Sequence, residues 1–186
     1  SSSELAYAAA ATTAKELKAV GINMNMSPVL DVNSNPANPV IGDRAFGSTP
    51  SPVCVLGEAT VGGLQDHGVV ACGKHFPGHG FVAADSHIAI PVDERDPKDI
   101  LKEDAAPYGW LGMSLSAVMP AHVIYPKFDK QPAGFSTKWL TLLREEQDPR
   151  ALGNAAIFDT YQYMAGRQKA YDTWLKEQDA KLKGEP

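Results

Sequence analysis

Residues 73–87 read Gly-Lys-His-Phe-Pro-Gly-His-Gly-Phe-Val-Ala-Ala-Asp-Ser-His and follow directly after the apolar run at residues 69–72. Pro77, Gly78 and Gly80 oppose a continuous helix or strand, so the stretch is predicted to be an irregular loop that leaves the end of a buried strand. In α/β proteins, functional residues concentrate on such loops. We call residues 73–87 the signature segment.

One kind of site that the signature segment could form is a metal site. Its candidate ligands are His75, His79, Asp85 and His87, all of suitable types. The spacing argues against this interpretation, because His75 and His79 would share a face only on a helix, which Pro77 and Gly78 oppose. The rest of the sequence also offers no obvious second cluster to complete a coordination shell.

The other kind of site is a proton-transfer pair. Asp85 and His87 are two residues apart, so in an extended or turning segment their side chains project the same way. Asp85 could then fix the tautomer of His87 and raise its pKa, which would make His87 a general acid. A third alternative is a loop whose histidines only satisfy backbone groups.

Composition limits the class of protein. The 186 residues fit one domain, and the net charge of −5 comes without clustered basic residues, so neither nucleic acid nor an anionic membrane is an expected partner. The sequence shows no apolar run long enough to span a bilayer and no signal-peptide pattern at its start. Cys54 and Cys72 lack a metal-binding spacing and are expected to be buried thiols in a reducing compartment.

The rest of the chain alternates predicted helices and strands. Helices are predicted over residues 3–20, 52–67, 97–113 and 137–146, and strands over residues 22–30, 69–72 and 115–119. Asp96 is expected to cap the third helix, which Pro97 begins. Pro107 and Gly109 are expected to kink or divide it. The repeated order of helix, strand and loop predicts a parallel α/β sheet.

Two polar residues outside the signature segment are also candidates. Arg44 lies in a long loop at residues 31–52, where it either forms a surface ion pair or presents its donors to hydroxyl groups or a carboxylate. His122 follows the strand predicted at residues 115–119, where it is either a pocket residue or a packing residue.

The signature segment resembles a loop of the bacterial β-N-acetylglucosaminidases of glycoside hydrolase family 3, which are cytoplasmic enzymes of cell-wall recycling. The resemblance lies in Lys-His-Phe-Pro-Gly-His-Gly at residues 74–80, followed after four residues by Asp-Ser-His. Upstream, residues 22–31 and 38–47 resemble the family's preceding strand and arginine loop, and downstream, residues 118–126 and 131–136 resemble its next strand and loop. The resemblance covers about residues 4–146.

This resemblance implies a fold and a reaction. The fold would be part of a (β/α)₈ TIM barrel with the site at the C-terminal ends of the strands. The reaction would be retaining hydrolysis of terminal N-acetyl-β-D-glucosaminides, without a cofactor or metal, on a glycan or muropeptide. Its catalytic pair would be His87 and Asp85. The substrate-binding residues would be Arg44, Lys74 and His75, with His122 a further candidate.

The pattern changes after residue 146. Residues 1–146 are interpreted as a partial barrel domain and residues 147–186 as a C-terminal helical tail, because residues 155–182 have helical composition with one apolar stripe. Residues 157–159, Ile-Phe-Asp, match the family's nucleophile segment only weakly, so Asp159 is a weak candidate and the nucleophile is otherwise unknown.

Two alternatives to a working glycosidase therefore stay open. One is a catalytically inactive fragment or sugar-binding remnant that lacks the nucleophile. The other is a metal-dependent hydrolase that uses the histidines of the signature segment. The oligomeric state cannot be predicted from the sequence.

Overall fold

The computed structural model describes residues 1–84, 89–112, 114–145 and 156–157. Four parallel strands form its sheet in the order β1-β2-β3-β6. They are β1 (Met24–Asn25), β2 (Val70–Phe76), β3 (Ala117–Pro120) and β6 (Ala156–Ile157). Neighbours in the sheet are thus successive parallel strands of the chain, and helices connect them. This confirms the predicted parallel α/β fold as part of a (β/α)₈ barrel.

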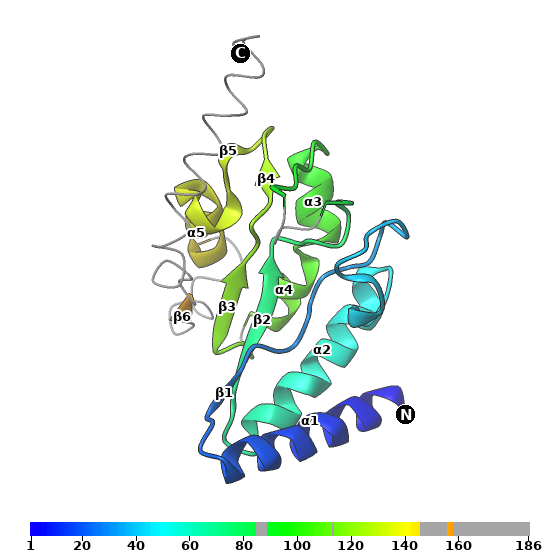
Figure 1. Cartoon of the computed structure of the whole chain (residues 1–186), viewed down its shortest axis with the longest axis vertical. Helices are drawn as coiled ribbons and strands as arrows, with labels where there is room; N and C mark the ends of the chain where they lie inside the picture. Colours follow the sequence, from blue (N-terminus) through cyan, green and yellow to red (C-terminus); the bar gives the residue numbers. More distant parts are fainter. Residues whose placement is uncertain (85–88, 113, 146–155, 158–186) are drawn as a thin grey trace.

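The helices begin and end where local chemistry favours it. In α1 (Ser2–Ala19), Ser1 forms a capping box with Glu4, and Gly21 follows with a φ of 82°. Helix α2 (Pro50–Gln65) begins with a proline, whose missing N–H costs nothing at that position. Figure 1 shows α1 packed against α2, and α2 also contacts β2.

The helix predicted over residues 97–113 is divided in two, as expected. Asp96 caps α3 (Pro97–Glu103), because its carboxylate accepts the Lys98 N–H at 2.8 Å. Helix α4 (Ala106–Leu111) then begins with Pro107 in its first turn. Pro107 has no N–H for the carbonyl of Glu103, which is why α3 ends there. Helix α5 (Thr137–Glu145) follows β3.

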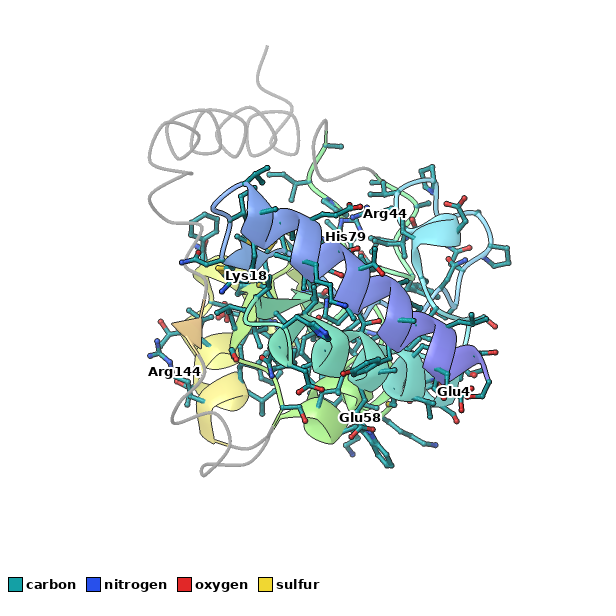
Figure 2. All side chains as sticks on the ribbon, turned by 90° about the horizontal axis from the view of Figure 1, so that it is seen from below. Glu4, Lys18, Arg44, Glu58, His79 and Arg144 are labelled. Atoms are coloured by element: carbon teal, nitrogen blue, oxygen red, sulfur yellow. The ribbon has the colours of Figure 1, made fainter. Side chains whose placement is uncertain are left out.

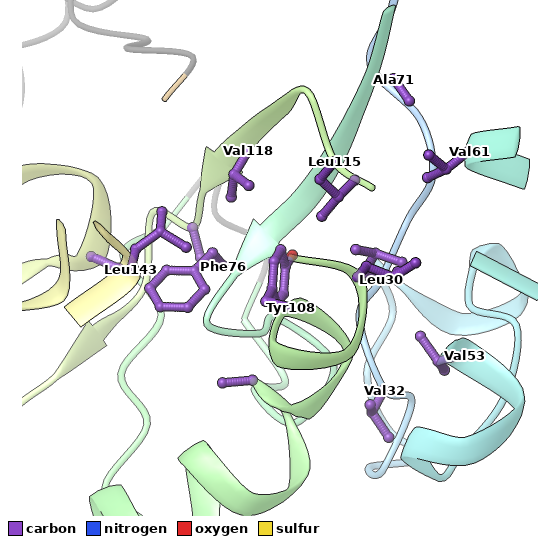
Figure 3. Close-up of a cluster of buried hydrophobic side chains, with 14 of the residues drawn as sticks. Leu30, Val32, Val53, Val61, Ala71, Phe76, Tyr108, Leu115, Val118 and Leu143 are labelled. Atoms are coloured by element: carbon purple, nitrogen blue, oxygen red, sulfur yellow. The ribbon is translucent and has the colours of Figure 1, made fainter. Parts of the chain in front are cut away.

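The core lies between the sheet and its helices. Phe76, the last residue of β2, is fully buried and meets Tyr108 and Trp139 edge-on, with ring centroids 5.2 and 6.0 Å apart. Figure 3 shows Leu30 and Val53 on the other side of Tyr108. These aromatic and aliphatic contacts fix the end of β2, from which the signature segment continues. Cys54 and Cys72 are buried and free, as predicted.

Strand β1 covers only Met24–Asn25 of the residues 22–30 predicted as a strand, and three further features differ from the sequence-based predictions. Strand β2 does not stop at Cys72 but continues to Phe76, because residues 28–30 on one side and β3 on the other pair with it. A short antiparallel hairpin of β4 (Ile124–Tyr125) and β5 (Asp129–Pro132) was not predicted. Residues 156–157 form a strand beside β3, not the helix expected there.

Among the described residues, no helix is both long and apolar enough to cross a membrane. The division of the chain at residue 146 stays a prediction.

Candidate active site

The candidate site lies at the C-terminal edge of the sheet. Lys74 and His75 lie in the last three residues of β2, and His122 follows the end of β3 by two residues. Because β2 and β3 are parallel, both ends meet at the same edge. The prediction that Lys74 and His75 sit on an irregular loop was wrong, since both are held in the strand.

The carboxylate of Asp31 is the buried centre of this edge. Its Oδ2 lies 2.8 Å from Nδ1 of His75, and its Oδ1 accepts the backbone N–H groups of His75 and His79 at 3.2 and 2.7 Å. Burial by itself would raise the pKa of Asp31, but the charge of His75 and hydrogen bonds from both histidines hold it below its ordinary value. Asp31 is therefore ionised at neutral pH.

An ionised carboxylate can only accept hydrogen bonds, so Nδ1 of His75 carries a proton and Nε2 is the nitrogen left to meet a ligand. The His75 side chain is 19% exposed, whereas that of Asp31 is fully buried. Asp31 thus fixes the orientation of the His75 ring, while part of the His75 side chain remains exposed.

His79 lies next to this pair without a helix to bring it there. His79 is 2% exposed as a residue, and its ring centroid lies 5.9 Å from that of His75. The expectation that these two histidines could share a face only on a helix was therefore wrong. Among the described residues, no group of three His, Cys, Asp or Glu side chains is placed to hold a metal ion.

Lys74 and Arg44 approach each other at the same edge. Partial burial lowers the pKa of Lys74, and the positive charge of Arg44 lowers it further, while Asp31 acts in the opposite direction. Arg44 belongs to the short helix η1 (Gly42–Arg44), and its Nη1 donates to the Val40 carbonyl at 3.0 Å. In Figure 2, Arg44 lies on the same side of the molecule as His79.

A buried asparagine joins the arginine loop to the signature segment. Oδ1 of Asn38 accepts the N–H groups of Val40 and Ile41, and its Nδ2 donates to the His79 carbonyl at 2.7 Å. The sequence analysis assigned no role to Asn38 or to Asp31. Asp31 had a usable signal, because it directly follows the apolar pair Val29 and Leu30 at the end of a predicted strand.

His122 packs beside η2 (Ala133–Phe135), where its ring centroid lies 6.3 Å from that of Phe135. Its role in binding stays a prediction. Asp85, His87 and Asp159 lie outside the described residues, so their assigned roles also stay predictions.

Comparisons with known proteins agree with this architecture. A family model described as the glycosyl hydrolase family 3 N-terminal domain matches residues 1–169. A beta-hexosaminidase of Bordetella avium (strain 197N) is 50% identical over 169 residues, which cover 90% of this chain and 47% of that protein. The beta-hexosaminidase of Bordetella pertussis (strain Tohama I) is 54% identical over 76% of this chain and 40% of its own length.

Solved structures give the same result. A glycoside hydrolase family 3 beta-N-acetylglucosaminidase from Paenibacillus sp. str. FPU-7 matches with a TM-score of 0.77 and 43% identity, over 83% of this chain and 30% of that chain. NagZ from Neisseria gonorrhoeae in complex with N-trifluoroacetyl-D-glucosamine matches with a TM-score of 0.73 and 42% identity, over 77% of this chain and 42% of that chain.

The chain spans about half the length, or less, of the curated relatives it matches. The match of the family model over most of the chain, together with the identity to these relatives, shows that the chain belongs to glycosyl hydrolase family 3 and contains residues of its N-terminal domain.

Proposed function

We propose that the chain hydrolyses terminal N-acetyl-β-D-glucosaminides with retention of configuration. The observation that carries this is the grouping of Lys74, Arg44 and the Asp31-bound His75 at one edge of the sheet in a chain of this family. The nitrogen donors of Lys74 and His75 on β2 and of Arg44 on η1 suit the ring hydroxyls and acetamido group of a neutral sugar. The solved NagZ bound to N-trifluoroacetyl-D-glucosamine supports the choice of sugar.

In the first step, His87, oriented by Asp85, donates a proton to the glycosidic oxygen while the bond from that oxygen to C1 breaks. A carboxylate forms the new bond to C1, giving a glycosyl-enzyme ester. In the second step, His87 takes a proton from water, the water oxygen bonds to C1, and the carboxylate leaves. The imidazole is neutral after the first transfer and is an imidazolium again after the second, so at no stage does it add a second anion beside the nucleophile.

Asp159 is the candidate for that carboxylate. It follows β6 by two residues in the sequence, and β6 is a parallel neighbour of β3. Catalytic residues of TIM barrels come from the C-terminal ends of several strands, so this spacing supports Asp159 more than the helix expected from composition did.

The family resemblance extends the proposal to the natural substrate and its compartment. We expect muropeptides or other glycans of cell-wall recycling that end in N-acetylglucosamine, encountered in the cytoplasm. A neutral sugar needs no basic patch on the protein, which agrees with the net charge of −5.

Release of 4-nitrophenol from 4-nitrophenyl N-acetyl-β-D-glucosaminide tests this function. The rate should fall at least about 100-fold in His87→Ala, because a general acid contributes that much or more. His67→Ala is the matched control, since His67 lies beyond the end of α2, where its Nδ1 is 3.0 Å from the Gly63 carbonyl and its ring meets that of Tyr7. NMR should show the β-anomer as the first product.

Equal rates for the unaltered chain and His87→Ala would rule out this mechanism. Calorimetric binding of N-acetylglucosamine without any turnover would instead support the sugar-binding remnant. Loss of activity on adding a chelator would support the metal-dependent hydrolase. Covalent trapping of a fluorosugar on Asp159, located by peptide mass, would identify the nucleophile.

A further inference from the structure

The backbone at residues 78–81 is irregular but held at every carbonyl. The first carbonyl accepts the Tyr125 hydroxyl, and the second accepts Nδ2 of Asn38 at 2.7 Å. The third accepts the backbone N–H of Asn35 at 3.4 Å, and the fourth accepts Nδ2 of Asn35 at 2.6 Å. Four successive carbonyls therefore have fixed partners on other parts of the chain, which restricts this part of the signature segment to one course.

A charged cluster lies against this backbone. Nε and Nη2 of Arg95 bind the two carboxylate oxygens of Asp93 at 3.0 and 2.7 Å, and its Nη1 lies 2.9 Å from Oδ2 of Asp104. Both carboxylates are 1% exposed and the arginine side chain is 16% exposed. The planar guanidinium thus has its edges fixed by two buried carboxylates, in the manner that bidentate arginine pairs allow.

The cluster touches both ends of the four-residue stretch. The Cζ atom of Arg95 lies 3.8 Å from the ring centroid of Phe81. At the other end, Asp104 packs so closely on Gly78 that a Cβ there would meet the Cβ of Asp104 at 2.5 Å. A guanidinium held at its edges offers its face, and an aromatic ring is the group that best fits that face.

We propose that Arg95 is a positioning residue for the proton-transfer step, acting through Phe81. By holding the Phe81 ring, Arg95 fixes the backbone at residue 81. The predicted catalytic pair begins four residues later in the sequence, at Asp85. A lysine could keep the charge but would lose the planar fork and the stacked face. This role rests on the proposed function, and it requires Arg95 to affect turnover more than sugar binding.

Variants of Phe81 test this without exposing buried charge. Phe81→Leu removes the ring that stacks on Arg95 and leaves the ion pairs intact, whereas Phe81→Tyr keeps the ring. Phe81 is 36% exposed, so the leucine variant is expected to fold. Trp110→Leu is the matched control, because Trp110 is an exposed aromatic on α4 that bonds Glu58.

In the glycoside assay on the whole chain, kcat of Phe81→Leu should fall about tenfold while KM changes less than about twofold, because small misplacements act on the chemical step. Phe81→Tyr should keep kcat near that of the unaltered chain, and Arg95→Lys should lower it as Phe81→Leu does. Trp110→Leu should change neither constant.

Hydrogen exchange gives a readout that does not need activity. Amides at residues 79–84 should exchange at least about fivefold faster in Phe81→Leu and Arg95→Lys than in Trp110→Leu, since local opening becomes easier when the stacking contact is lost. If the chain shows this exchange pattern but no turnover, the proposed function is wrong, while the contact by which Arg95 holds the backbone near Phe81 is confirmed. Unchanged exchange, or an equal loss of kcat in Phe81→Tyr and Phe81→Leu, would overturn the role of Arg95.

Discussion

The carboxylate of Asp31 and the imidazole of His75 form a buried pair, with Oδ2 and Nδ1 2.8 Å apart, although 44 residues separate them in the chain. Parallel pairing of residues 28–30 with β2 brings them together. The carboxylate fixes the tautomer of His75, because it requires the proton on Nδ1.

Asp31→Asn should lower the free energy of unfolding by about 2 kcal/mol, because the buried, ionised carboxylate accepts three hydrogen bonds. Urea denaturation at pH 7 measures this. Asp66→Asn is the control, since Asp66 is an exposed carboxylate that accepts the Tyr7 hydroxyl at 2.9 Å, and it should stay within about 0.5 kcal/mol.

The same carboxylate has a predictable response to acid. Its folded-state pKa is lowered, so the stability it contributes is present above the ordinary pKa of an aspartate, near about 4, and is lost as the pH falls through the folded value. The difference between the unaltered chain and Asp31→Asn should shrink below about pH 4. A difference that grew on acidification would contradict the lowered pKa.

Asp104 should produce the opposite dependence at higher pH. Burial raises its pKa to about 6, although the positive charge of Arg95 acts in the opposite direction. The negative charges of Asp93 and Glu103 raise the pKa slightly further. Tyr125 is another titratable group nearby. Between about pH 4 and 6 the folded chain therefore holds more protons than the unfolded chain, so stability falls as the pH rises through about 6.

Asp104→Asn isolates that effect in urea titrations from pH 4 to 7. Over this range the unaltered chain should lose on the order of 2–3 kcal/mol more stability than Asp104→Asn, a loss that follows from a shift of about two pKa units. Identical slopes in the two proteins would show that Asp104 titrates normally.

Lys74→Met should weaken binding of N-acetylglucosamine about tenfold or more in calorimetry, because a charged hydrogen-bond donor at the site is lost. Lys98→Met, at an exposed position of α3, should leave the affinity unchanged.

Arg44→Met should raise the pKa of Lys74 measured by NMR, since the charge of Arg44 lowers it. An unchanged lysine titration would mean that the two cations do not share a site.

Gly80→Ala should destabilise the fold by about 2 kcal/mol or more, because overpacking cannot be relieved when backbone is the neighbour. A Cβ at Gly80 would meet the Val32 carbonyl oxygen at 1.8 Å, whereas at Gly62, within α2, it would meet only the Tyr7 ring at 3.6 Å. Gly62→Ala should therefore gain about 0.5–1 kcal/mol from helix propensity. Thermal denaturation of both variants checks the contrast.

Local sequence patterns predicted the helices, three of the four parallel strands and the division of the helix at Pro107, because capping residues, prolines and periodicity act over a few positions. They did not predict β6, since a two-residue strand depends on β3 beside it, nor the hairpin of β4 and β5. The roles of Asp31 and Asn38 also depended on strand register and loop packing, which no single stretch encodes.

Since each parallel strand lies beside its predecessor in the chain, the sheet has a folding consequence. During translation, β2, β3 and β6 therefore each leave the ribosome after the neighbouring strand that precedes them in the chain. The sheet can thus extend one strand at a time, and until the following strand pairs with it, the newest strand exposes an edge of unpaired N–H and C=O groups.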